Sequence, residues 1–87
     1  MINYLVEFVG TFIFLSVILI TGDPLAIGLT LAGVIWFGSQ SSGGHFNPAV
    51  SFMMLMNKKI NLVKFIMYVL SQLLGASAAF LYFKSLK

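Results

Sequence analysis

The feature that most constrains the fold is a set of long apolar runs separated by short polar turns. The first run extends from Tyr4 to Ile20 and carries one ionisable side chain, Glu7. A helix over this run would be about 26 Å long, near the lower limit for crossing the ~30 Å hydrocarbon core of a bilayer. We therefore predict a first transmembrane helix over residues 4–20.

Two more spans are predicted further along the chain. The turn Thr21-Gly22-Asp23-Pro24 ends the first helix, and apolar residues 25–39 follow it. Because this turn is short, the first two helices are expected to be antiparallel neighbours. Residues 62–83 are long enough for a third span, which Lys84 and Lys87 would anchor at its far end.

Composition and charge place the chain among membrane proteins. Hydrophobic residues make up 60% of the sequence and charged residues 8%, and the mean hydropathy is +1.03. The net charge of +3 comes from lysines near the ends of apolar runs, a pattern typical of membrane flanks rather than of nucleic-acid binding. There is no cysteine, so disulfides and thiolate metal sites are excluded.

The segment over residues 40–56 differs from the three spans. It begins polar and glycine-rich and ends in a short apolar stretch, from Pro48 to Met56, that cannot cross a bilayer. Asn47 can cap a helix, and Pro48 suits a first helical position. Irregular backbone at membrane depth is tolerated where it is buried in protein or lines a water-filled cavity. We therefore predict a re-entrant loop and half-helix beside a pore.

The ten residues Ser42-Gly43-Gly44-His45-Phe46-Asn47-Pro48-Ala49-Val50-Ser51 closely resemble the first Asn-Pro-Ala box of aquaporins and glycerol facilitators, the major intrinsic proteins. Two further segments resemble the same family, residues 7–12 in the first span and 68–76 in the third. The resemblance covers the whole chain but only half of the family's usual six spans. It implies an all-α membrane protein with three transmembrane helices and one re-entrant half-helix, and it implies a channel rather than an enzyme.

The resemblance also assigns roles to particular residues. It implies that the re-entrant segment lines the pore through Gly43, Gly44, His45, Phe46, Asn47, Pro48 and Ala49. Asn47 would offer amide donors to a passing water or hydroxyl oxygen, and the loop carbonyls would act as acceptors. His45 has two open interpretations: a group on the permeation path, or a neutral side chain bonded to the loop. No second metal-ligating side chain lies at ligand spacing from it, and no cofactor is expected.

Three further positions follow from the resemblance. Glu7 would brace the loop by accepting backbone N–H bonds, with Gln72 helping from the third span. The alternative for Glu7 is that it snorkels to the membrane surface. Ile27 falls at the family's selectivity-filter position, in place of a bulky aromatic residue. The filter arginine follows the second Asn-Pro-Ala box, and this chain contains neither that box nor any arginine.

Half of an inverted repeat needs a second half to close a pore. The expected partners are therefore the lipid bilayer, water or small neutral solutes such as glycerol, and either a separate C-terminal half or an antiparallel copy of this chain. Candidate small-residue contacts between helices in such an assembly are Ala32, Gly33, Gly75 and Ala79, and Gly10 and Gly75 are expected to be packing glycines. The alternatives are a non-conducting relative that modulates a full-length channel and a functionless remnant. The expected location is the plasma membrane with a cytoplasmic N-terminus.

Overall fold

The computed structural model describes residues 1–87 and contains four helices and no strands. The helices are α1 (Ile2–Thr21), α2 (Pro24–Gly38), α3 (Pro48–Met56) and α4 (Leu62–Ser85). Both α1 and α4 are long and apolar enough to cross a membrane, whereas α2 is apolar and shorter. The prediction of an all-α membrane fold is confirmed.

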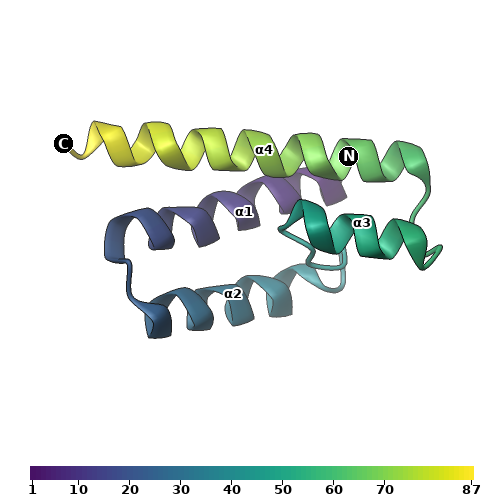
Figure 1. Ribbon diagram of the computed structural model, residues 1–87, viewed down its shortest axis with the longest axis horizontal. Coiled ribbons are helices and arrows are strands. Elements are labelled where there is room, and N and C mark those ends of the chain that lie inside the picture. The colour runs from purple at the N-terminus through teal and green to yellow at the C-terminus, as the bar shows by residue number, and fades with distance from the viewer.

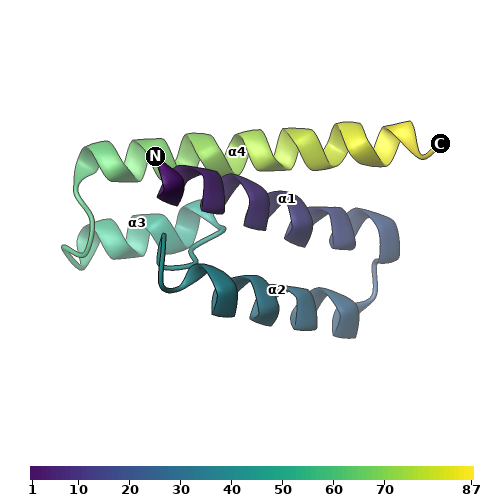
Figure 2. The same ribbon diagram turned by 180° about the vertical axis from the view of Figure 1, so that it is seen from behind.

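Helix α1 lies at the centre of the arrangement and packs against both α4 and α2 (Figure 1). Helix α3 packs against α4 alone and lies beside only one half of its length, as the reverse view also shows (Figure 2). The molecule measures 41 × 23 × 20 Å. Helix α3 is short and begins near the middle of the long axis of the molecule rather than at one end (Figure 1).

Local sequence explains where the helices begin and end. Gly22 takes a left-handed conformation after α1, which glycine adopts without steric cost. Asp23 then caps α2, because its carboxylate accepts the Ala26 N–H at 2.9 Å, and Pro24 occupies the first helical position. Asn61 caps α4 in the same way, accepting the Lys64 N–H at 2.8 Å. The short turn between α1 and α2 makes these helices antiparallel (Figure 1).

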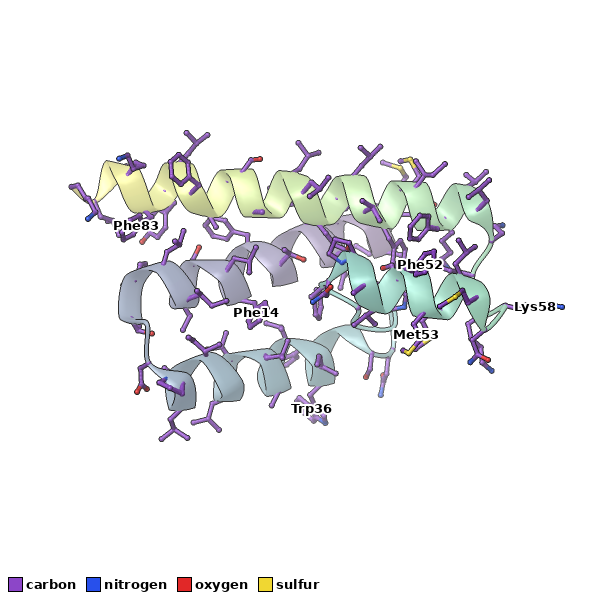
Figure 3. The ribbon with its side chains drawn as sticks, viewed as in Figure 1. Phe14, Trp36, Phe52, Met53, Lys58 and Phe83 are labelled. Atoms are coloured by element: carbon purple, nitrogen blue, oxygen red, sulfur yellow. The ribbon has the colours of Figure 1, made fainter.

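Burial in this chain is the reverse of that in a soluble protein. Of the 15 buried residues, eight are polar or charged and only three are hydrophobic; the hydrophobic ones are Phe46, Tyr68 and Ala79. Large apolar side chains cover the outside instead, and Figure 3 shows Trp36 pointing away from the bundle on the outer side of α2. A polar interior inside an apolar surface is the arrangement that hydrocarbon surroundings favour.

Two of the small residues expected at contacts between helices are buried within this chain. A methyl group at Gly75 would come within 2.7 Å of the Phe8 carbonyl oxygen, and Ala79 is completely buried. Gly75 therefore packs α4 against α1, as expected of a packing glycine, and neither residue is open to a second half. Small residues allow close helix approach wherever it occurs, so their presence alone does not identify the partner helix.

Candidate functional site

A buried carboxylate on α1 lies at the centre of the polar interior. Glu7 is fully buried and accepts four hydrogen bonds. Its Oε1 accepts from the Phe46 N–H at 2.7 Å and from Gln72 Nε2 at 2.8 Å. Its Oε2 accepts from Ser42 Oγ at 2.6 Å and from the His45 N–H at 3.0 Å. All four donors are neutral groups, so hydrogen bonds rather than an ion pair stabilise this buried charge.

Gln72 connects the carboxylate to α3. Its amide nitrogen donates to Glu7 and also to Ser51 Oγ at 2.9 Å. Ser51 Oγ lies 2.8 Å from His45 Nδ1. The Ser51 hydroxyl accepts from Gln72, and it can donate its own proton to Nδ1 when the His45 ring proton is on Nε2, or accept from Nδ1 in the other tautomer. The His45 ring is thus bonded to the half-helix rather than to the loop backbone.

Tyr68 of α4 holds the other side of the loop. Its hydroxyl donates to the Ser42 carbonyl at 2.6 Å, and the Ser42 hydroxyl accepts the Gly44 N–H at 3.1 Å. The Tyr68 ring also packs edge-on against the His45 ring, with centroids 4.8 Å apart. Hydrogen bonds from α1, α3 and α4 therefore converge on the same few loop residues.

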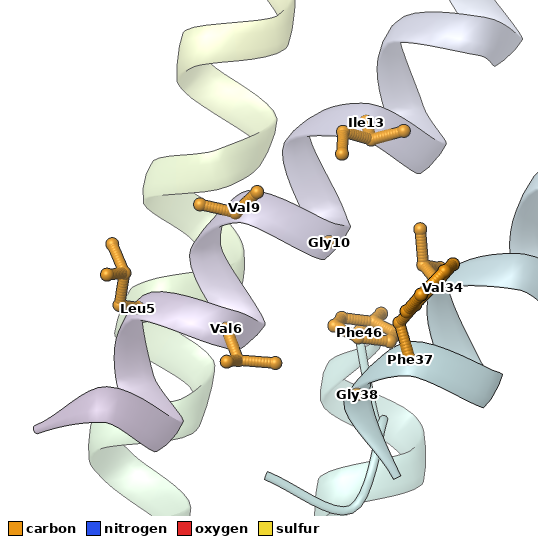
Figure 4. A pocket seen from close by; sticks show the side chains of 9 residues that line it. All are labelled: Leu5, Val6, Val9, Gly10, Ile13, Val34, Phe37, Gly38 and Phe46. Carbon is orange, nitrogen blue, oxygen red and sulfur yellow. The ribbon is translucent and has the colours of Figure 1, made fainter. Parts of the chain in front are cut away.

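The loop backbone follows a path that few residues adopt easily. Gly43, Gly44 and Phe46 all have positive φ, at 95°, 68° and 54°. For phenylalanine this conformation is strained. The Phe46 ring is 3% exposed and lies between Gly10 of α1 and Gly38 of α2 (Figure 4). The absence of side chains at these two glycines creates the space for the ring, which together with the bond to Glu7 offsets the strain.

The half-helix begins beside this loop with unused polar groups. Asn47 Oδ1 accepts the Ala49 N–H at 2.7 Å and caps α3, while the Asn47 amide nitrogen makes no hydrogen bond within the chain. Ala49, like Asn47 and Pro48, is exposed. The carbonyl groups of residues 43–46 also accept no hydrogen bond. Donors and acceptors are therefore available together at the start of the half-helix.

Most of the predicted site residues lie together beside the start of α3, but Ile27 lies apart from them. Residues 43–49, Glu7 and Gln72 form one cluster. Ile27 lies at the other end of α2, close to its Asp23 cap, and lines neither of the two cavities in the molecule. Sequence reasoning assigned no role to Ser42, Ser51 or Tyr68, although all three lie in the segments that carry the family resemblance.

An all-helical chain with a polar interior, an apolar exterior and a half-helix that begins near its middle defines an integral membrane protein with a re-entrant segment. The family model for the major intrinsic protein matches residues 2–87, so the chain belongs to the major intrinsic protein family. Members of this family are membrane channels, among them aquaporins and glycerol facilitators, and not enzymes.

Individual relatives show the extent of the match. The chain is 43% identical over 86 residues to glycerol uptake facilitator protein-like 6 of Lactiplantibacillus plantarum, covering 88% of this chain and 40% of the relative. It is 34% identical over 87 residues to the probable aquaporin PIP-type pTOM75 of Solanum lycopersicum, covering 80% of this chain and 30% of the relative. It is 47% identical over 54 residues to the lens fiber major intrinsic protein of Ovis aries, and this match covers 62% of this chain and 20% of the relative. The chain thus spans less than half the length of these curated relatives.

Proposed function

We propose that this chain is a subunit of a passive channel for water or small neutral solutes such as glycerol. The observation that carries the proposal is the pairing of a free Asn47 amide with the unbonded carbonyl groups of residues 43–46. An amide donor holds a transiting oxygen as an acceptor, and carbonyl groups receive its protons. The positive N-terminal end of α3 at the same place opposes cations.

Glu7 and Gln72 are proposed to act as braces for this arrangement. A permeation path needs polar groups that stay unpaired, and an unrestrained loop would satisfy them by folding back on itself. Glu7 accepts the N–H groups of His45 and Phe46, on the opposite side of the same peptide units whose carbonyls remain free. The brace therefore turns the carbonyl groups away from the protein interior.

A closed pore requires a second half. In the structure, α3 contacts α4 alone, so one side of the half-helix has no neighbouring helix. Each unmet backbone polar group costs several kcal/mol in hydrocarbon. We propose that a second half, either a distinct C-terminal half or an antiparallel copy, covers this side and meets the half-helix near the midplane.

Orientation follows from the lysines. Lys58, Lys59 and Lys64 lie near one end of the molecule, at the turn between α3 and α4, from which Lys58 projects in Figure 3. Lys84 and Lys87 lie at the other end, near the C-terminus (Figure 1). Positively charged flanks favour the cytoplasmic side. The three-lysine end, which is also the N-terminal end, is proposed to face the cytoplasm of a plasma membrane.

Replacing Asn47 with Asp tests the channel function. Aspartate caps helices as well as asparagine does, so the fold is expected to persist. It lacks the amide donors and adds a negative charge, so water flux is expected to fall about tenfold or cations are expected to pass. The measurement is stopped-flow osmotic shrinkage of proteoliposomes, with a parallel ion-flux assay.

Asn57→Asp provides the matched control, because Asn57 is also an exposed asparagine at an end of α3 but follows the last residue of the helix. We expect its flux to equal that of the unmodified chain. Unchanged water flux and ion exclusion in Asn47→Asp would contradict the role of Asn47. Absence of any flux in the unmodified chain, with or without a matching second half, would contradict the channel itself.

A second substitution tests the proposed filter position. Ile27→Trp adds a large rigid ring near the Asp23 end of α2, where Ile27 is partly buried. If Ile27 borders the narrowest part of the assembled pore, glycerol flux should fall several-fold more than water flux, because the larger solute is excluded first. Equal reduction of both fluxes, or none, would place Ile27 outside the constriction.

A further inference from the structure

The turn between α3 and α4 carries positive charge that no acidic side chain neutralises. Lys58 and Lys59 follow the end of α3, both are exposed, and Figure 3 shows Lys58 projecting away from the molecule. The chain has only two acidic side chains. Glu7 is fully buried, and Asp23 caps α2 at the opposite end of the molecule (Figure 1). Two ammonium groups are therefore free to bind an anion at this turn.

The backbone at Lys58 takes a conformation that lysine rarely adopts. Its φ is 60°, in the left-handed region, where glycine is the usual residue at a helix end because it has no Cβ. The Lys58 N–H donates to the Leu55 carbonyl at 3.1 Å, and the Lys59 N–H donates to the Met54 carbonyl at 2.9 Å. These backbone bonds form the turn without any help from the lysine side chains. A lysine at this strained position therefore points to a role for its ammonium group outside the fold.

An exposed apolar strip begins beside the turn and follows one side of α4. Its side chains are between 37% and 68% exposed, and they are Leu62, Val63, Ile66, Met67 and Leu70. Residues three and four positions apart lie on the same side of a helix, so the five side chains form a continuous strip about 12 Å long. The residues that α4 buries, among them Tyr68 and Gln72, lie on another side. The strip thus places apolar surface next to the two free lysines.

We propose that Lys58 and Lys59 bind the phosphate group of an anionic phospholipid whose acyl chains lie along the apolar strip. A phosphate oxygen accepts charge-assisted hydrogen bonds from ammonium groups. A phospholipid joins its charged headgroup to its apolar chains in the order in which the turn and the strip follow each other. A headgroup with a net negative charge is favoured over a zwitterionic one, because it carries no cation that the lysines would repel.

This lipid site goes beyond the proposed channel function. The groups proposed to line the permeation path lie at residues 43–49, at the other end of α3 from the lysine turn. The phospholipid would hold the turn at the level of the headgroups and would not enter the path.

A tryptophan placed beside the turn measures the lipid preference of this site. Trp36 of α2 is the only tryptophan in the chain, so Trp36→Phe with Val63→Trp gives a reporter chain with one tryptophan on the strip. The reporter is reconstituted in phosphatidylcholine vesicles that contain increasing fractions of brominated phosphatidylglycerol or of brominated phosphatidylcholine. Bromine quenches tryptophan on contact, so the two series give the relative binding of the two lipids. Each lysine near the membrane surface corresponds to about a fivefold preference for the anionic lipid. We expect a preference of that size or larger.

Two matched double variants locate the preference. Lys58→Gln with Lys59→Gln should make the two lipids bind equally to the reporter chain. Lys84→Gln with Lys87→Gln removes the same charge from the other end of the molecule (Figure 1), so the preference should not change.

Lys58→Gly separates lipid binding from folding. Glycine adopts a φ of 60° without steric cost, so the midpoint of unfolding in detergent should stay the same or rise. The preference for phosphatidylglycerol should nevertheless fall about fivefold, because one ammonium group is lost.

Four results would overturn the inference. Equal binding of the two lipids to the reporter chain would show that the site does not select an anionic headgroup. An equal loss of preference in both double variants would assign the effect to net charge alone. Displacement of phosphatidylglycerol by excess inorganic phosphate would assign the lysines to a soluble anion. Absence of quenching by either brominated lipid would show that protein rather than lipid covers the strip.

Discussion

Replacing Glu7 with Gln is expected to release the re-entrant loop and to lower the free energy of unfolding by about 2–4 kcal/mol. Each carboxylate oxygen accepts one loop N–H, Oε1 from Phe46 and Oε2 from His45. Whichever way the glutamine amide turns, its NH2 group faces one of these N–H donors. One buried backbone N–H therefore loses its acceptor, and the remaining bonds lose the strength that a charged acceptor gives.

The expected loss of unfolding free energy in Glu7→Gln is large compared with the net stability of a protein domain. Membrane and soluble domains alike are held by a small net free energy, of order 5–15 kcal/mol for soluble domains, so the substitution removes a substantial part of it. The strained positive φ of Phe46 is held partly by its bond to Glu7. We expect the loop to open and water flux to fall to background.

Asp23→Asn is the matched control, because it removes the other carboxylate of the chain. Asp23 is exposed and accepts only local N–H bonds of a helix cap, which asparagine can also accept. Unfolding of both variants is measured in mixed micelles by titration with a denaturing detergent. Equal midpoints for Glu7→Gln and Asp23→Asn would contradict the bracing role.

Replacing Gly75 with Ala is expected to separate α1 from α4 and to destabilise the chain by about 1–3 kcal/mol. The added methyl carbon would lie 2.7 Å from the Phe8 carbonyl oxygen and 3.2 Å from the Phe12 nitrogen. Both are backbone atoms, so no side chain can rotate to make room. The same shift would move Gln72, one turn earlier on α4, away from Glu7 and weaken the brace.

Gly28→Ala separates this packing effect from backbone propensity. Gly28 is also a helical glycine, but a methyl group there would meet nothing within 4 Å. Since alanine favours helix more than glycine does, Gly28→Ala is expected to be neutral or slightly stabilising. Thermal unfolding in detergent, followed by circular dichroism, ranks the variants. A Gly75→Ala midpoint equal to that of Gly28→Ala would show that α1 and α4 are less tightly packed than their contact distances indicate.

The sequence by itself determined the fold class. Long apolar runs, sparse charge and lysines at the flanks are local features, and they follow from the length and polarity of the bilayer. Asn47 followed by Pro48, in a stretch too short to span, also marks the half-helix from local chemistry alone. The match to the ten-residue box and to two other segments indicated the family.

The sequence did not determine which groups meet across the fold, because a residue type does not specify its distant partners. Glu7 and Gln72 are 65 positions apart, and only the packing of α1 against α4 brings them to 2.8 Å. Gly75 illustrates the same limit, since small size permits close approach but does not say to which helix. The unpaired oxygens of Thr11 and Gln72 are visible only when every other hydrogen bond in the interior has been assigned.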